Sequence, residues 1–227
     1  MKIETIYEEI RMIKLAISMP PDPGLPLTLL KQCGVKHAVG GISLSPIPDA
    51  DEEEQPWSYP SLMKAKAAYR KNGITLSVIE SRPPMEKIKL ALPGRDEEIE
   101  VVCELLRNMG KVGIPVWCSM WMPILGVIRT TRTISTRGGA HVSGYDHAEF
   151  GNEPMEEYGT ITEEQQWANL KYFLERTVPV AEEAGVKMAM HPDDPPLSPI
   201  RGIARIMSSI ENYQNHFYHD ETYSNNV

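Results

Sequence analysis

Cysteine and long apolar stretches are scarce in this chain. It holds three cysteines among 227 residues, and no two of them are spaced as a CxxC pair. This pattern indicates neither a disulfide framework nor a zinc knuckle, and it favours a reducing compartment. No apolar run approaches the roughly 18 residues of a membrane span. The first residues include Glu4, Glu8 and Glu9, where a signal peptide is basic and then apolar. We therefore expect a cytoplasmic protein with no membrane partner.

Positive charge is also in short supply. Lysine and arginine number 23 against 31 aspartates and glutamates, which gives a formal net charge of −8. This balance argues against nucleic acid as a partner, because surfaces that bind nucleic acid are basic. A glycine-rich phosphate loop and a nucleophile elbow are absent as well. The sequence therefore indicates neither a nucleic-acid-binding protein nor an enzyme of these two motif classes.

What the chain does contain is an alternation of short apolar runs and amphipathic segments. The apolar runs predict strands at 12–18, 35–42, 74–80, 114–120 and 186–190. The segments between them predict helices at 28–34, 60–72, 96–110 and 162–185. Thr28 is expected to cap the first helix, Gly110 to end the third, and a capping box at Thr162 and Gln165 to open the fourth. This order predicts an α/β protein built from βαβ units around a parallel sheet.

Residues 123–161 interrupt this rhythm. The segment is rich in Arg, Thr, Gly and His and sustains neither a helical nor a strand period. Connections longer than about 15 residues inside a compact domain are usually functional or disordered. We interpret this one as a long loop over the active face that carries Arg129. Residues 1–214 are then expected to form one domain, and residues 215–227 a polar tail.

The last predicted strand ends in the most distinctive stretch of the sequence. There an apolar run passes into His191-Pro192-Asp193-Asp194-Pro195-Pro196. Residues just past the carboxyl end of a parallel strand lie where α/β folds keep their chemistry, which makes His191 a candidate metal ligand. The prolines should hold Asp193 and Asp194 in a stiff, extended loop. An alternative stays open, in which His191 only caps a strand and both aspartates are solvated turn residues.

Polar residues also follow two earlier strands. Glu80 ends the strand at 74–80, and the strand at 114–120 leads into the loop with Arg129. A (β/α) barrel builds its site from several strand ends that meet at one rim. We therefore expect Glu80, Arg129 and His191 to share one edge of the sheet.

Several segments, taken together, resemble the mannonate dehydratase family, whose members have a TIM barrel of the xylose-isomerase-like kind. The matching segments are 78–81, 106–110, 122–125, 129–130, 180–196 and 202–206, within a resemblance that covers roughly residues 24–214. The run from His191 to Pro196 is the most specific of them. The resemblance implies a partial TIM (β/α) barrel with about five of the eight strands present.

The resemblance also implies a reaction. Family members dehydrate D-mannonate to 2-keto-3-deoxy-D-gluconate in hexuronate (glucuronate) catabolism, with Mn²⁺ or Fe²⁺ as cofactor. His191 carries over as a metal ligand, because a neutral imidazole suits such ions. Arg129 matches a family arginine and is expected to hold the substrate carboxylate with a two-point fork. We expect Arg129 and Asp193 to be catalytic, and Arg129, Glu80 and Asp194 to contact the sugar acid.

The sequence also departs from the family pattern. Gly41-Ile42-Ser43-Leu44 stands where the family has paired histidines, and residues 118–123 lack a tyrosine and an asparagine of the family motif. The family's other metal ligands, a cysteine, a histidine and an aspartate, come from strands six to eight, whereas this chain ends at Val227. Three interpretations stay open: a metal-dependent hydro-lyase, an isomerase or epimerase of a related sugar acid, and an inactive, truncated copy. A homo-oligomer also stays open.

Overall fold

A parallel sheet forms the centre of the molecule. The computed structural model describes residues 13–218, with side chains described as far as residue 214. Strand order in the sheet is β1-β2-β3-β4-β7, and every neighbouring pair is parallel. The strands are β1 Ala16–Ser18, β2 His37–Gly40, β3 Thr75–Glu80, β4 Val116–Met120 and β7 Lys187–His191. Each falls on an apolar run that predicted a strand, which confirms the α/β class; Met12 lies outside the described residues.

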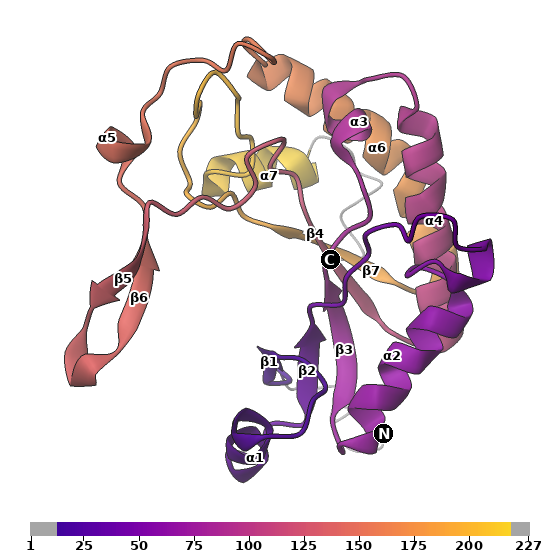
Figure 1. The fold of residues 1–227 in the computed structure, drawn as a ribbon. Coiled ribbons are helices and arrows are strands. Elements are labelled where there is room, and N and C mark those ends of the chain that lie inside the picture. The colour runs from indigo at the N-terminus through magenta and orange to yellow at the C-terminus, as the bar shows by residue number, and fades with distance from the viewer. Residues whose placement is uncertain (1–12, 219–227) are drawn as a thin grey trace, which may run out of the picture.

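Long helices cover one face of this sheet (Figure 1). Within the described part of the chain they are α2 Tyr59–Lys71, α4 Arg95–Val112 and α6 Glu163–Ala184. The core lies between sheet and helices, where Trp117 of β4 packs with residues of α4 and α6. In β4, Trp117 and Ser119 are buried, whereas Cys118 and Met120 are half-buried on the opposite face. The sheet therefore has a packed outer face and a more accessible inner face. No helix in residues 13–218 is long and apolar enough to cross a membrane.

Helix α6 begins and ends as its sequence predicts. The Thr162 hydroxyl accepts the Gln165 amide N–H at 3.3 Å, and the Gln165 side chain accepts the Thr162 N–H at 2.8 Å. This is the expected capping box. Gly185 ends the helix in the left-handed region, with φ of 67°.

Two predicted helix boundaries are wrong. Helix α1 spans Leu25–Gln32, and its N-cap is Gly24. Thr28 therefore lies inside the helix, where its hydroxyl donates to the Gly24 carbonyl at 3.0 Å. Helix α4 continues past Gly110 to Val112, and Gly113 is its C-cap. Gly110 serves packing instead, because a Cβ at this position would lie 2.4 Å from the Ala184 carbonyl oxygen of α6.

Several short elements have no counterpart in the prediction. They are the 3-10 helix η2 Glu52–Glu54, helix α3 Glu86–Leu90 and helix α7 Ile210–Tyr218. Helix α7 crosses the expected boundary between domain and tail at residue 214. The remainder of the predicted tail, from residue 219, lies outside the described residues.

The 123–161 segment contains regular structure, contrary to the prediction. Strands β5 Thr131–Ser135 and β6 His141–Gly144 form an antiparallel hairpin, with the 3-10 helix η3 Arg137–Gly139 at its turn and helix α5 His147–Phe150 after it. The hairpin projects away from the sheet (Figure 1). The strands are polar and mostly exposed, so the alternation of apolar and polar residues that identifies a half-buried strand is missing.

The second half of this segment packs against the residues that follow β7. The Ile161 N–H donates to the Gly202 carbonyl at 2.9 Å, and the Ala204 N–H donates to the Ile161 carbonyl at 3.0 Å. Gly202 has φ of +81°, and a Cβ there would meet the Gly159 carbonyl oxygen at 2.8 Å. The two long connections therefore support each other beside the sheet.

Candidate functional site

Glu80 and His191 meet at the carboxyl edge of the sheet. Glu80 ends β3 and His191 ends β7, with β4 between these strands. The His191 Nε2 lies 3.9 Å from the Glu80 Oε1, and the side chains keep 27% and 33% of their exposure respectively. The prediction that Glu80 and His191 lie at the same edge of the sheet is therefore confirmed. Their chemical roles stay predictions.

The ring of His191 is oriented by its own loop. Its Nδ1 lies 2.5 Å from the Pro192 carbonyl oxygen, a contact that a proton on Nδ1 satisfies. That tautomer leaves a lone pair on Nε2, the nitrogen nearer Glu80. A histidine held in this way is suited to accept a proton or to ligate a metal ion.

The donor set around His191 is too small for a metal site. Among the described residues, no three His, Cys, Asp or Glu side chains lie close enough together to hold an ion. Burial, and after it the charge of Glu80, raises the pKa of Cys118, so this thiol tends to keep its proton when no metal is bound. The Fe²⁺ sites of non-haem oxygenases, for example, use two histidines and a carboxylate. Glu80 and His191 alone do not fit Mn²⁺ or Fe²⁺, and we derive no step through a metal.

Arg129 and Asp194 form a two-point ion pair beside this edge. The Arg129 Nη1 donates to Asp194 Oδ1 at 2.7 Å, and Nη2 donates to Oδ2. The Arg129 Nε also donates to Ser143 Oγ at 3.0 Å. Hydrogen bonding from Arg129 holds the pKa of Asp194 below its ordinary value, with burial opposing it. The Arg129 guanidinium is thus oriented to bind a carboxylate through two hydrogen bonds, and in this structure the carboxylate is that of Asp194.

Asp193 has a different environment from its neighbour. Its side chain is 4% exposed, and its Oδ2 accepts the Met207 N–H at 2.7 Å. Its own N–H donates to the Met207 carbonyl at 2.9 Å. Burial raises the pKa of Asp193, and the Met207 hydrogen bond partly offsets this. Asp193 therefore fixes the loop after β7 to residue 207. Its predicted catalytic role stays a prediction.

The prediction overlooked Arg205, which joins the loops after β4 and β7. Its side chain is 1% exposed and donates to the Asp194 carbonyl at 3.2 Å and the Gly126 carbonyl at 2.7 Å. The sequence carries a signal for this role, since Arg205 interrupts the apolar run 203–207. A charge inside an apolar run is normally paired or hydrogen-bonded.

A second overlooked contact holds the turn that follows β4. The buried Lys89 donates from Nζ to Glu86 Oε1 at 2.8 Å and to the Met122 carbonyl at 3.1 Å. The other oxygen of Glu86 accepts the Ile124 N–H at 2.8 Å. Ile124 has φ of 61°, which is unusual for a β-branched residue. Lys89 and Glu86 thus clamp the start of the loop that leads to Arg129.

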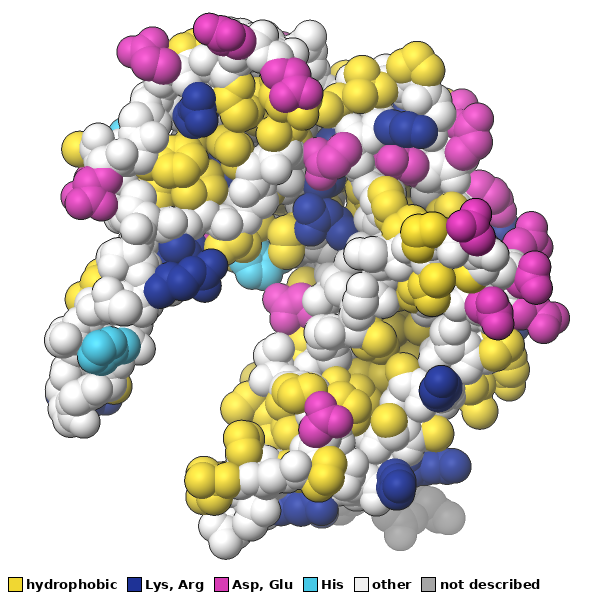
Figure 2. All heavy atoms as spheres, viewed as in Figure 1, with side chains coloured by type: hydrophobic (Ala, Val, Ile, Leu, Met, Phe, Trp, Pro, Cys, Tyr) yellow, Lys and Arg dark blue, Asp and Glu magenta, His cyan; other side chains and the backbone are white. Residues whose placement is uncertain are grey.

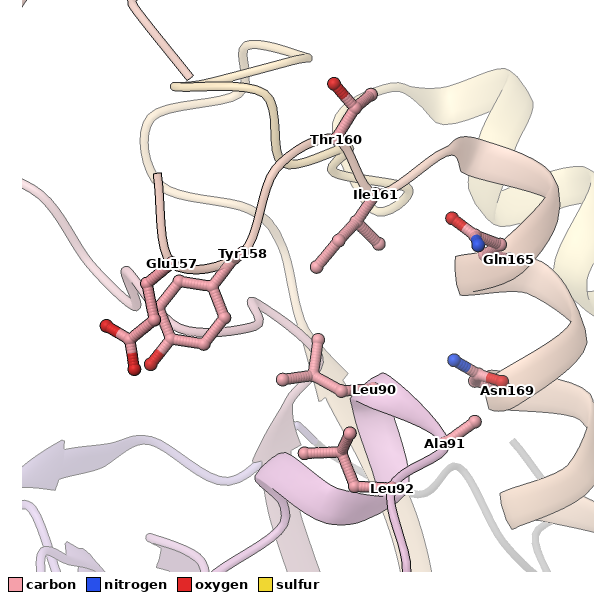
Figure 3. Close-up of a pocket in the computed structure, with 9 residues that line it drawn as sticks. All are labelled: Leu90, Ala91, Leu92, Glu157, Tyr158, Thr160, Ile161, Gln165 and Asn169. Carbon is pink, nitrogen blue, oxygen red and sulfur yellow. The ribbon is translucent and has the colours of Figure 1, made fainter. Parts of the chain in front are cut away.

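A cavity of about 470 Å³ lies elsewhere, between the end of α3 and the first turns of α6 (Figure 3). Residues of the 157–161 segment also line this cavity. Its lining combines apolar side chains with the amides of Gln165 and Asn169, and consists of Leu90, Ala91, Leu92, Glu157, Tyr158, Thr160, Ile161, Gln165 and Asn169. The lining includes none of the predicted site residues, so this cavity is separate from the Glu80 and His191 edge.

Comparisons with known proteins agree with one another. A family model described as D-mannonate dehydratase (UxuA) matches residues 20–157 and 151–227. A mannonate dehydratase of Thermotoga petrophila is 35% identical over 212 residues, which cover 80% of this chain and 57% of the relative. Mannonate dehydratase 1 of Bacillus licheniformis is 35% identical over 185 residues, which cover 68% of this chain and 50% of the relative.

A solved structure resembles this fold closely. The crystal structure of mannonate dehydratase from Streptococcus suis serotype2 has a TM-score of 0.79 and 30% sequence identity, over 93% of this chain and 61% of that one. The likeness confirms the expected partial (β/α) barrel. The chain spans about 57% of the length of the Thermotoga relative. On the family model and these relatives, the chain belongs to the mannonate dehydratase family.

Proposed function

We propose that the protein to which these residues belong dehydrates D-mannonate to 2-keto-3-deoxy-D-gluconate and water, as a step of hexuronate breakdown. The observation that carries the proposal is the fork of Arg129, which holds a carboxylate next to the Glu80 and His191 edge of a sheet with this family's fold. Asp194 follows His191 by three residues in the loop after β7, which supports a single site made of both parts.

The substrate carboxylate takes the place of Asp194 on Arg129. Dehydration removes the proton from the carbon next to that carboxylate, and the electrons of the broken C–H bond form a carbon–carbon double bond. The neighbouring C–O bond breaks, and its oxygen leaves as water after gaining a proton. The resulting enol becomes the 2-keto acid. Negative charge spreads onto the carboxylate as the proton leaves, and a two-point contact with Arg129 stabilises it.

The other candidate residues follow from their placement. Glu80 is accessible beside His191 and is proposed to contact the sugar acid, as is Asp194 once it is displaced from Arg129. Asp193 is proposed to support the reaction by fixing the loop after β7, because its carboxylate accepts the Met207 N–H. His191 is retained as the candidate ligand for Mn²⁺ or Fe²⁺.

The remaining proposals concern setting and assembly. The substrate is a small sugar acid, and neither nucleic acid nor a membrane is a proposed partner, in keeping with the net charge of −8. The cytoplasm is the proposed location, because the three cysteines are free and form no disulfide framework. Homo-oligomerisation is proposed as well.

Product analysis tests the proposed reaction. The purified protein is incubated with D-mannonate and with related hexonates, with and without Mn²⁺, and the products are separated and identified. A 2-keto-3-deoxy acid from D-mannonate is the expected result. An isomeric hexonate with no loss of water would overturn the proposal and point to an isomerase or epimerase.

A further inference from the structure

The cavity between α3 and α6 has the size and the lining of a small-molecule site (Figure 3). Its volume of about 470 Å³ lies within the range of about 300–1,000 Å³ that ligand pockets occupy. Its apolar wall includes Leu92 and Tyr158, which are 45% and 39% exposed. Ala91, the C-cap of α3, also lines the cavity and has φ of 53°, a conformation that side chains rarely adopt. Such backbone outliers cluster at ligand sites.

Two amide side chains of α6 bring a hydrogen-bond donor and an acceptor to this cavity. The Gln165 Oε1 accepts the Thr162 N–H at 2.8 Å, which leaves its Nε2 donor without a partner among residues 13–214. The Asn169 Nδ2 donates to the Lys89 carbonyl at 2.8 Å, which leaves its Oδ1 acceptor in the same position. Residues four apart on a helix are neighbours, and Figure 3 shows both amides pointing from α6 toward the cavity. A hydroxyl group, which both donates and accepts, satisfies the pair.

The charge of the lining disfavours an anionic ligand. Glu157 is a lining residue, and none of the described lining residues is a lysine, arginine or histidine. A carboxylate or phosphate in the cavity would lie near Glu157 without a cation of the lining to neutralise it. The sugar acid of the proposed reaction is itself an anion, so this cavity is not a second site for it. Leu90 and Ile161 offer an apolar surface instead, which favours an uncharged ligand with an apolar body.

Both walls of the cavity are connected to the loops after β4 and β7. Lys89 of α3 donates from Nζ to the Met122 carbonyl at 3.1 Å, in the loop after β4. The Ile161 carbonyl accepts the Ala204 N–H at 3.0 Å, and the next residue, Arg205, donates to the loop after β7. A ligand that moves either wall therefore acts on the two loops that carry the predicted site residues.

We propose that this cavity binds a small uncharged alcohol and that binding shifts the loops after β4 and β7. The hydroxyl group lies between Gln165 Nε2 and Asn169 Oδ1, and the apolar body packs on Leu92 and Tyr158. The alcohol is thus an effector that binds away from the Glu80 and His191 edge. The inference concerns a site outside the proposed reaction and does not depend on that reaction.

Nuclear magnetic resonance titration of the isotope-labelled full chain with cyclohexanol tests the proposal, since this probe carries one hydroxyl on a compact apolar ring. Saturable shifts are expected at the Ile161 N–H and at the Ile128 N–H, which donates to the Asp194 carbonyl at 3.2 Å. Cyclohexanecarboxylate is the matched probe, with the same ring and a negative charge. Its dissociation constant should be at least ~10-fold higher, because it cannot donate to Asn169 and is repelled by Glu157.

Two variants change the cavity and leave the neighbouring hydrogen bonds supported. Asn169→Leu removes the acceptor, whereas the Lys89 carbonyl keeps a donor in Gln166 Nε2 at 3.1 Å. Leu92→Trp fills part of the cavity from a position that is 45% exposed. Each variant should raise the dissociation constant for cyclohexanol at least ~5-fold. Leu29→Trp is the matched control on α1, where Leu29 is 49% exposed, and it should leave the constant unchanged.

The amide spectra of the variants verify that each keeps the wild-type fold. A wild-type protein without saturable binding, equal affinity for the two probes, or an affinity unchanged in either cavity variant would overturn the site. Saturable shifts at the lining with none at Ile128 would overturn the effect on the loops. None of these measurements requires turnover of D-mannonate, so a failure of the proposed reaction leaves them unaffected.

Discussion

Arg129 and Asp194 lie 65 residues apart in the sequence and face each other as a two-point ion pair. The pair connects the loop after β4 with the loop after β7. The buried Arg205 connects the same two loops through the carbonyl groups of Gly126 and Asp194. Two arginines thus connect the same two loops. Arg205 does so from the interior, and Arg129 does so at the accessible edge, where a substrate carboxylate can bind.

Asp194→Asn removes the charge of this pair and keeps its size. Arg129 holds the pKa of Asp194 below its ordinary value, so the stabilisation is fully present above the unfolded-state pKa of about 4 and is lost as pH falls through the folded-state pKa. We expect the wild-type protein to be more stable than the variant at pH 7, by less than about 1 kcal/mol because the pair is partly exposed. Thermal unfolding across a pH series should show that the stability difference between wild type and variant disappears at acid pH. Asp51→Asn, at an exposed position, is the control, and a difference independent of pH would contradict the account.

Lys89 should make the stability depend on pH in the alkaline range. Burial lowers the pKa of Lys89 to about 8, with the charge of Arg82 as the next cause. An unfolded lysine keeps its proton up to a pKa of about 10.4. Between these values the unfolded chain binds more protons, so the free energy of unfolding rises with pH. Denaturant unfolding should show the wild-type protein gaining stability relative to Lys89→Met from about pH 8 to about pH 10. The exposed Lys64→Met should show no such gain, and a flat or falling difference for Lys89→Met would count against the account.

Gly110→Ala tests the contact between α4 and α6. Alanine favours a helix over glycine by about 1 kcal/mol, but the new Cβ would lie 2.4 Å from the Ala184 carbonyl oxygen. Because this neighbour is backbone, the helices must move apart, and we expect a net loss of about 1–3 kcal/mol in unfolding free energy. Gly41→Ala is the matched control, since a Cβ there meets nothing within 4 Å. A stabilised Gly110→Ala variant would show that the helices are not in this contact.

Arg205→Met tests the internal connection between the two loops. The substitution removes the donors to the Asp194 and Gly126 carbonyls and keeps a long side chain in a site that is 1% exposed. The Asp194 carbonyl keeps the Ile128 N–H as a donor, whereas the part-buried Gly126 carbonyl loses the donor it has from Arg205. An acceptor left without a donor costs about 1–3 kcal/mol when it is buried. We expect a clear drop in unfolding free energy and faster hydrogen exchange at the Ile128 N–H, which donates to the Asp194 carbonyl at 3.2 Å. Arg70→Met on the exposed surface of α2 should change neither, and protected exchange at Ile128 in Arg205→Met would contradict this role.

The sequence predicted those parts of the fold whose signals are local. Apolar runs located the strands of the central sheet, and the capping box at Thr162 located the start of α6. Glu80 and His191 could be placed at one edge because the carboxyl ends of parallel strands must share an edge.

The remaining features depend on contacts between distant segments. Gly110 carries the local signal of a helix end, yet its role is set by Ala184 on another helix. The β5–β6 hairpin has no apolar alternation because both of its faces are mostly exposed. The partner of Arg129 could not be read from the sequence either, since only the fold brings Asp194 to the guanidinium.

The turnover of D-mannonate by wild-type protein and by Arg129→Ala tests the central claim most directly. The account predicts a 2-keto-3-deoxy acid from the wild-type protein and a kcat/KM lowered about 10- to 100-fold in the variant, the value of a lost charge-assisted contact. Arg70→Ala, at an exposed position on α2, should match the wild type. Unchanged kcat/KM in Arg129→Ala, or unaltered D-mannonate after incubation with the folded wild-type protein, would contradict it.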